Sequence, residues 1–120
     1  MVVMRQRMGK TDRLARRKDL DRVFRQGRRV SDALLTLHVI RNELGRSRMA
    51  VAVSVQHGPA VARVRIKRLC REGFRLQRGE LPAGIDYVLK PRVGAELTLA
   101  DVMESLRRLA SKAERLLPPG

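Results

Sequence analysis

The sequence predicts a small two-layer α+β domain, with helices packed on a mostly antiparallel sheet. Helix-like and strand-like hydrophobic patterns follow one another in the order α-β-β-α-β-α. The 120 residues are enough for one modest core and too few for two domains. The core must be mainly aliphatic, because the only aromatic residues are Phe24, Phe74 and Tyr87.

The N-terminal part of the chain predicts a basic arm followed by a short helix. Residues 1–12 are basic and lack a continuous apolar stretch, which predicts a flexible arm and argues against a secretory signal. The folded domain is expected over residues 13–117. Within it, a helix is expected over about 17–26, because Gly27 is a natural stop. The apolar residues at helical spacing before that stop are Leu20, Val23 and Phe24.

Two strands are expected next. Residues 33–41 alternate in side-chain character, as a strand does. Residues 48–55 are rich in Val and Ala and predict a second strand. A short turn containing Gly45 separates the two, so we expect them to pair with each other antiparallel.

The second half predicts a long basic helix, a third strand and a final helix. The basic helix is expected from Pro59, which suits a first turn, to about Arg78. The third strand is expected over 85–90. The final helix is rich in Leu and should begin after Thr98, whose spacing from Asp101 resembles a capping box.

The basic helix divides into a charged side and an apolar side. At about 100° per residue, six of its seven basic residues fall within roughly 140° of arc, and Arg65 lies outside that arc. The opposite side is apolar and consists of Ala62, Ile66, Leu69 and Gly73. Cys70 and Phe74 lie toward the edge of that apolar side. The basic residues are Arg63, Arg65, Lys67, Arg68, Arg71, Arg75 and Arg78.

The charge balance indicates a polyanionic partner. Lys and Arg number 27 against 12 acidic residues, which gives a net charge of +15. Arg greatly outnumbers Lys, and its planar guanidinium pairs with phosphate through two hydrogen bonds, which favours nucleic acid over a membrane surface. No apolar run is long enough to span a bilayer.

The sequence offers no constellation for metal binding or catalysis by the chain itself. Cys70 is the only cysteine, which excludes an intramolecular disulfide and makes a reducing compartment the default. We interpret Cys70 as a small core residue, because no base lies near it in sequence. His38 and His57 are isolated, so we assign neither metal ligands nor catalytic residues.

Residues 63–75 read RVRIKRLCREGFR. This stretch resembles the signature of the bacterial ribonuclease P protein component, which is Arg-Asn-Arg-x-Lys-Arg-x-x-Arg-Glu-x-Phe-Arg. Val64 stands where the family has Asn, and every other element matches. The resemblance extends from about Lys10 to Leu117. Its other parts include Val53-Ser54, Gly58, Asp86-Tyr87-Val88 and Arg92.

The resemblance implies both a fold and a function. The fold would have the order α-β-β-β-α-β-α, with an additional strand near 28–31 and a left-handed β-α-β crossover beside the basic helix. The function would be that of the protein subunit of ribonuclease P, a cytoplasmic endoribonuclease that removes the 5′ leader from precursor tRNA. In the family the RNA subunit performs the chemistry with Mg²⁺ held mainly by RNA. The isolated chain is therefore expected to need no cofactor and to have no catalytic activity.

The resemblance also implies partners and two groups of site residues. The partners would be the catalytic RNA and precursor tRNA, and we expect neither a membrane nor a protein partner. The RNA-binding residues would be Arg63, Arg65, Lys67, Arg68, Arg71 and Arg75. A cleft for the single-stranded leader would be lined by Leu20, Phe24, His38 and Val64. Leu20 replaces a frequent Phe and His38 a frequent Tyr, so we expect Phe24, His38 and charge to hold the leader.

Simpler interpretations are open at several of these positions. Phe24 fits a core residue as well as a leader contact, and His38 fits an ordinary surface histidine. Arg65 could form a local ion pair or contact a phosphate from another side of the helix. For the whole chain, a structural RNA-binding protein similar to a small ribosomal protein shares the same size, charge and fold class.

Overall fold

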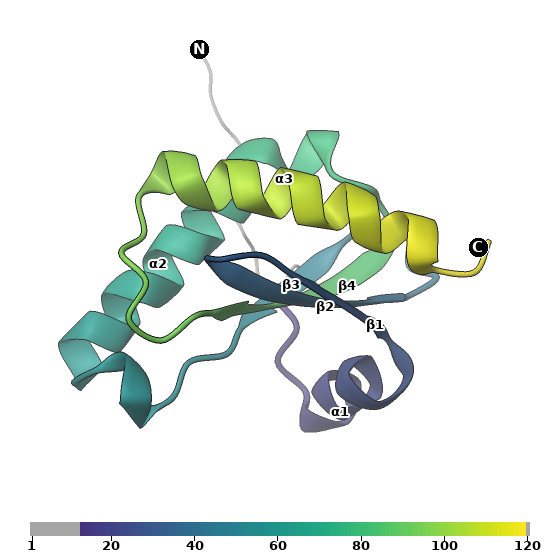
Figure 1. Cartoon of the computed structure of the whole chain (residues 1–120). Coiled ribbons are helices and arrows are strands. Elements are labelled where there is room, and N and C mark those ends of the chain that lie inside the picture. The colour runs from purple at the N-terminus through teal and green to yellow at the C-terminus, as the bar shows by residue number, and fades with distance from the viewer. Residues whose placement is uncertain (1–12, 120) are drawn as a thin grey trace, which may run out of the picture.

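The computed structural model describes residues 13–119, and the predicted arm over 1–12 lies outside them. These residues form three α-helices, two short 3₁₀ turns and one four-stranded sheet (Figure 1). In chain order the elements are α1 (Arg17–Gln26), β1 (Arg28–Ser31), β2 (Leu35–Arg41), β3 (Arg48–Val51), η2 (Val55–His57), α2 (Ala60–Gln77), η3 (Arg78–Glu80), β4 (Ile85–Pro91) and α3 (Leu99–Leu116).

Local sequence signals placed most of these elements correctly. α1 has the predicted bounds, and β1 is the strand near 28–31 that the family resemblance implied and that local periodicity did not resolve. The predicted cap of the last helix is also present, since Thr98 Oγ1 accepts a hydrogen bond from Asp101 N–H at 3.1 Å. The carboxylate of Asp32 accepts N–H bonds from Leu34 and Leu35, which forms the turn before β2.

The sheet has the strand order β1-β2-β4-β3. β2 pairs antiparallel with both β1 and β4, whereas β3 pairs parallel with β4. Because α2 connects these two parallel strands, β3-α2-β4 is the crossover unit that the family resemblance implies. The hand of that crossover stays a prediction.

The prediction that the strands over 33–41 and 48–55 pair with each other is wrong. β4 lies between them, and the second strand ends at Val51. β4 is buried on both faces, with every residue from Ile85 to Leu89 buried, so it gains most from a central position with a neighbour on each side. A short connecting turn favours a hairpin, but here the burial of β4 outweighs it.

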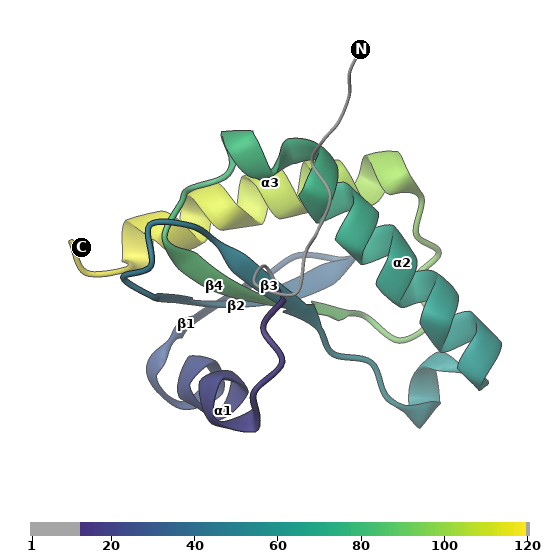
Figure 2. The ribbon, with the colours of Figure 1, turned by 180° about the vertical axis from the view of Figure 1, so that it is seen from behind.

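Helices cover both faces of the sheet (Figures 1 and 2). α2 and α3 pack on one face and enclose the larger core, in which Leu37, Phe74 and Leu106 are fully buried. α1 packs on the opposite face over a smaller apolar cluster of Leu14, Val23, Ile40 and Val88. The two predicted layers are therefore present, and α1 adds a partial third.

A buried ion pair ties the sheet to α1. The guanidinium of Arg48 on β3 binds the carboxylate of Asp86 on β4, with its shorter contact at 2.7 Å, and reaches Asp19 on α1 at 3.4 Å. Asn42 donates a further hydrogen bond to Asp86 at 2.8 Å. Since the Asp86 side chain is only 1% exposed, removing one partner would leave a charge buried without compensation. This network fixes α1 beneath the strands.

Candidate nucleic-acid interface

α2 is rotated relative to the prediction from its periodicity. The buried residues are Cys70, Gly73, Phe74 and Gln77. Leu69, which we expected on the apolar side, is half-buried next to the arginines. The rotation follows from the packing of α2 on α3, because Gly73 lies against Val102 and the Gln77 side chain donates to the Met103 carbonyl at 2.8 Å.

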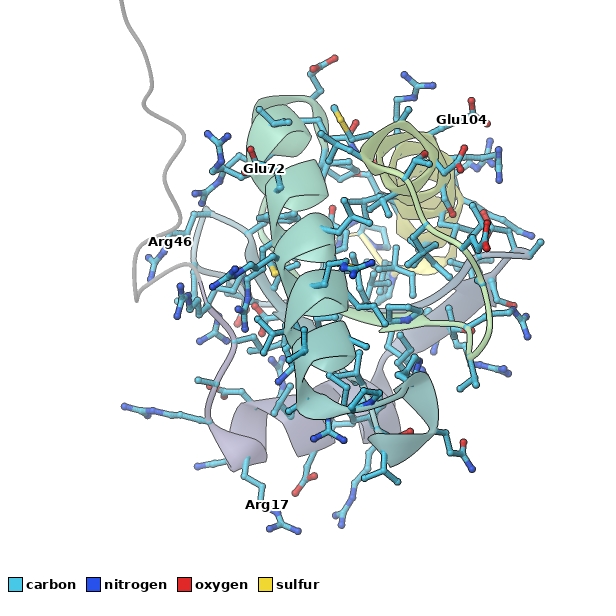
Figure 3. The ribbon with its side chains drawn as sticks, turned by 90° about the vertical axis from the view of Figure 1, so that its left-hand side faces the viewer. Arg17, Arg46, Glu72 and Glu104 are labelled. Carbon is cyan, nitrogen blue, oxygen red and sulfur yellow. The ribbon has the colours of Figure 1, made fainter. Side chains whose placement is uncertain are left out.

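The rotation brings most of the predicted RNA-binding arginines to one open depression. The depression has a volume of about 590 Å³. It is lined by Arg13, Arg65, Arg68, Leu69, Arg71, Glu72 and Arg75. Arg65, which helical spacing put outside the charged arc, is one of them. We call these lining residues the α2 depression; Figure 3 shows α2 from this side of the molecule.

Arg13 is a contributor that the pattern of the helix could not reveal. It precedes α1 and reaches the depression because Arg13 forms a parallel bridge with Met49 of β3, and the adjacent Leu14 N–H donates to the Met49 carbonyl at 2.9 Å. This pairing carries the segment before α1 alongside the edge strand next to α2. In the sequence, the only sign of this pairing is the apolar Leu14 next to Arg13, and the structure buries that side chain.

The cations in the depression repel one another. The pKa of Arg71 is lowered by partial burial and then by the positive charge of Arg13. Arg75 is held by Glu72 through two hydrogen bonds of 2.7 Å, and the Arg75 hydrogen bond lowers the pKa of Glu72. An exposed pair of this kind contributes little to stability but limits the directions in which Arg75 points. An anionic partner would relieve the repulsion that one carboxylate leaves uncompensated.

Arg63 and Lys67, the other two predicted RNA-binding residues, are half-buried and do not line the depression. The guanidinium of Arg63 donates to the Gly58 carbonyl at 3.3 Å, just before the helix begins. At 100° per residue, Lys67 lies between the buried stripe and Arg71, whereas Arg63 lies in line with the buried stripe, in the first turn of the helix. The basic residues of α2 therefore span two sides of the helix and do not form a single row.

Three of the four predicted cleft residues lie on the sheet face covered by α1. The Phe24 and His38 rings meet edge to face with centroids 4.8 Å apart, and Lys90 Nζ lies 5.9 Å from the Phe24 centroid. Leu20 packs against the apolar cluster that includes Val88, the residue opposite His38 in the β2–β4 pairing. Phe24 is 44% exposed, so it is an accessible aromatic surface and not a core residue.

The His38 imidazole is embedded and uncharged near neutral pH. Its pKa is lowered by burial first, then by the positive charges of Lys90 and Arg29. Within residues 13–119, Nε2 is buried and has no hydrogen-bond partner. The His38 ring therefore packs against the Phe24 ring and is not an ordinary surface histidine.

Val64 belongs to a different surface. It lies on α2 and is 45% exposed, and Val61, one turn earlier, is 76% exposed. No contact described for residues 13–119 joins Val64 to Leu20, Phe24 or His38. Nothing in the packing of α2 explains an apolar residue at this position.

Comparison with known proteins agrees with the signature in α2. The family model described as Ribonuclease P matches residues 8–114. The ribonuclease P protein component of Pelotomaculum thermopropionicum is 38% identical over 104 residues, which cover 86% of this chain and 93% of the relative. This chain belongs to the ribonuclease P protein family.

Other ribonuclease P proteins agree in sequence and in fold. The component from Clostridium acetobutylicum is 33% identical over 107 residues, covering 87% of this chain and 90% of the relative. The solved ribonuclease P protein from Thermotoga maritima superposes with a TM-score of 0.77 at 28% identity, covering 83% of this chain and 96% of the other. The protein from Staphylococcus aureus gives a TM-score of 0.75 at 26% identity, covering 88% and 97%.

Outside the basic surfaces, the reactive side chains of Cys70 and His57 are buried or hydrogen-bonded. Cys70 is fully buried, and burial raises the pKa of its thiol to about 12, so it is not a nucleophile. His57 accepts the Ser54 N–H at Nδ1 and places Nε2 2.7 Å from the Pro91 carbonyl, which anchors the turn before α2. Among residues 13–119 no group of three or more His, Cys, Asp or Glu side chains could hold a metal ion. No helix in this part of the chain could cross a bilayer.

Proposed function

We propose that this chain is the protein subunit of ribonuclease P and binds both the catalytic RNA and the 5′ leader of precursor tRNA. The observation that carries the proposal is the α2 depression, where Arg65, Arg68, Arg71 and Arg75 of the family signature converge with Arg13. Folded RNA presents phosphates from neighbouring strands, and a cluster of guanidiniums neutralises them while fixing their spacing.

The second part of the proposal concerns the leader. Phe24 offers an exposed ring, His38 braces that ring, and Lys90 adds a positive charge beside it. Stacking of one base on an aromatic ring contributes about 1–3 kcal/mol without reading sequence. A single-stranded leader would lie on this surface, and its binding would position the scissile bond of the precursor tRNA.

The hydrolysis itself belongs to the RNA in this proposal. Mg²⁺ would supply charge stabilisation and activate the attacking water, and RNA would hold it. The described residues offer no cluster of carboxylates or imidazoles suited to a metal pair. The protein would raise substrate affinity and so lower the Mg²⁺ concentration that cleavage requires.

A precursor-tRNA cleavage assay at low Mg²⁺ tests the proposal. Catalytic RNA alone should cleave slowly, and added protein should accelerate the reaction. RNA binding without acceleration would instead indicate a structural RNA-binding protein, and cleavage without added RNA would indicate a protein-only nuclease. Arg68→Ala and Arg71→Ala should each weaken RNA binding, whereas Arg107→Ala, an exposed change on α3, should have little effect.

A further inference from the structure

A second cationic cavity lies away from α2, where the end of α1, the start of β1 and the end of β2 meet the segment that follows α3. Its volume is about 370 Å³, within the range of pockets that hold small ligands. Arg22, Arg28 and Arg41 line it, and Glu43 is the one acidic residue in its lining. We call it the C-terminal pocket. Neither the family signature nor the predicted leader cleft includes any of these residues.

Two of the three arginines are held in place by backbone carbonyls at the last residue of α3 and in the segment after it. Arg28 Nε donates to the Leu116 carbonyl at 3.1 Å, and Arg41 Nε donates to the Pro118 carbonyl at 2.6 Å. Both bonds use Nε, and no other hydrogen bond of these two side chains is described within residues 13–119. The terminal amino groups of each guanidinium are therefore available for an anion, and the Nε hydrogen bond already orients the guanidinium plane.

Apart from these charged residues and Gln26, the lining of the pocket is apolar. Ile40 and Leu117 are each 9% exposed, and Pro118 and Pro119 complete the lining. Oriented guanidiniums beside an aliphatic lining suit a ligand with a phosphate at one end and a ring at the other. A nucleotide has this chemistry, because its phosphate pairs with Arg while its base or ribose packs on apolar side chains.

The pocket is separate from the leader surface. At about 100° per residue, Phe24 lies roughly 160° around α1 from Arg22, and the buried Val23 lies on the longer arc between them. Gln26, the other α1 residue in the pocket, falls on the same flank as Arg22. An RNA strand stacked on Phe24 would therefore run along the opposite flank of α1.

We propose that the C-terminal pocket binds one unpaired nucleotide of the ribonuclease P RNA complex, with its phosphate held by Arg22, Arg28 and Arg41 and its ring on the apolar lining. This inference rests on the proposed function, since it needs an RNA partner. It adds an RNA contact on a part of the surface that lies outside both the α2 depression and the surface around Phe24. Packing against aliphatic side chains selects for an unpaired nucleotide without selecting its base.

Binding measurements on the reconstituted holoenzyme test the pocket. Arg22→Gln removes one charge, and the only hydrogen bond described for this side chain is a 3.3 Å contact with the Arg41 carbonyl, so folding should be preserved. Affinity for the catalytic RNA, with precursor tRNA present, should fall three- to tenfold. The slope of the logarithm of affinity against the logarithm of salt concentration should become shallower by about 0.7–0.9. Arg107→Gln, the same charge change on the exposed face of α3, is the matched control and should change affinity less than twofold.

A cross-linking experiment gives a second readout that does not depend on charge. A photo-cross-linker on Gln26→Cys, at the rim of the pocket, should form an RNA adduct in the holoenzyme. The same reagent on Ser111→Cys, exposed on α3, should form none. Cys70 is fully buried and should not be labelled.

The experiments distinguish failure of the pocket inference from failure of the proposed function. If the wild-type protein stimulates cleavage but Arg22→Gln behaves as Arg107→Gln and Gln26→Cys gives no adduct, the pocket inference is wrong and the proposed function stands. That result would also be expected if the pocket served an acidic protein segment. If the wild-type protein neither binds RNA nor stimulates cleavage, both proposals fail together.

Discussion

An exposed apolar side chain lies on α2 at the position where the family signature has Asn. Val64 is 45% exposed and is flanked in sequence by Arg63 and Arg65. Burial does not explain it, and Val can neither donate nor accept a hydrogen bond. Its methyl groups occupy surface that an RNA hydroxyl or a hydrated ion could otherwise contact.

We therefore predict that Val64→Asn improves processing. One additional hydrogen bond contributes about 1 kcal/mol, which corresponds to roughly a fivefold gain in cleavage rate at limiting Mg²⁺. Single-turnover cleavage across a Mg²⁺ titration measures the gain. Val61→Asn, at the more exposed valine one turn earlier, is the control and should change little. An unchanged Mg²⁺ dependence in Val64→Asn would show that the RNA side of this contact has adapted to valine.

His38 predicts a pH dependence of stability. Its folded-state pKa is lowered from 6.5 by burial and by the charges of Lys90 and Arg29, so folding favours the neutral ring. The corresponding stabilisation is fully present above the unfolded pKa and is lost as pH falls through the folded pKa. Urea unfolding between pH 7.5 and 5 should show a steeper loss for the wild type than for His38→Gln, which keeps polarity without titrating. Parallel curves would mean that the ring is hydrated in the folded protein.

The crossing of α2 over α3 depends on one glycine. A Cβ at Gly73 would approach Val102 Cγ1 to 2.8 Å, which is closer than packed side chains tolerate. Since this crossing sets the rotation of α2, it also determines which arginines face outward. This contact between two helices thus controls which arginines make up the proposed RNA-binding surface.

We predict that Gly73→Ala destabilises the protein by about 1–3 kcal/mol through overpacking, partly offset by the better helix propensity of Ala. Gly79→Ala is a matched control, because a Cβ there meets no atom within 4 Å. Thermal or urea unfolding compares the two. If the helix shifts to accommodate the methyl group, Gly73→Ala should instead retain stability and lose affinity for the catalytic RNA. A variant with both properties intact would contradict this account of the crossing.

At the scale of the whole molecule, the features that could be predicted are those encoded by neighbouring residues. The bounds of α1, the cap at Thr98 and the basic stretch of α2 all follow from residues a few positions apart. The central position of β4 and the approach of Arg13 to α2 depend on which distant segments bury each other. Single-sequence periodicity does not contain that information. For the same reason, Phe24 and His38 could be named from the resemblance, while their contact could not.

The distribution of charge over the whole molecule predicts a steep response to salt. If about six phosphates are neutralised at mixed duplex and single-stranded sites, the logarithm of the binding constant should fall with the logarithm of salt concentration with a slope of about −4 to −5. Titrating the protein into labelled catalytic RNA from 50 to 400 mM salt measures that slope. Arg68→Ala and Arg71→Ala should each make it shallower by about 0.7–0.9, because each removes one phosphate contact in the α2 depression. A wild-type slope near −1 would mean that few phosphates are contacted, and the net charge of +15 would then require an explanation other than a folded RNA.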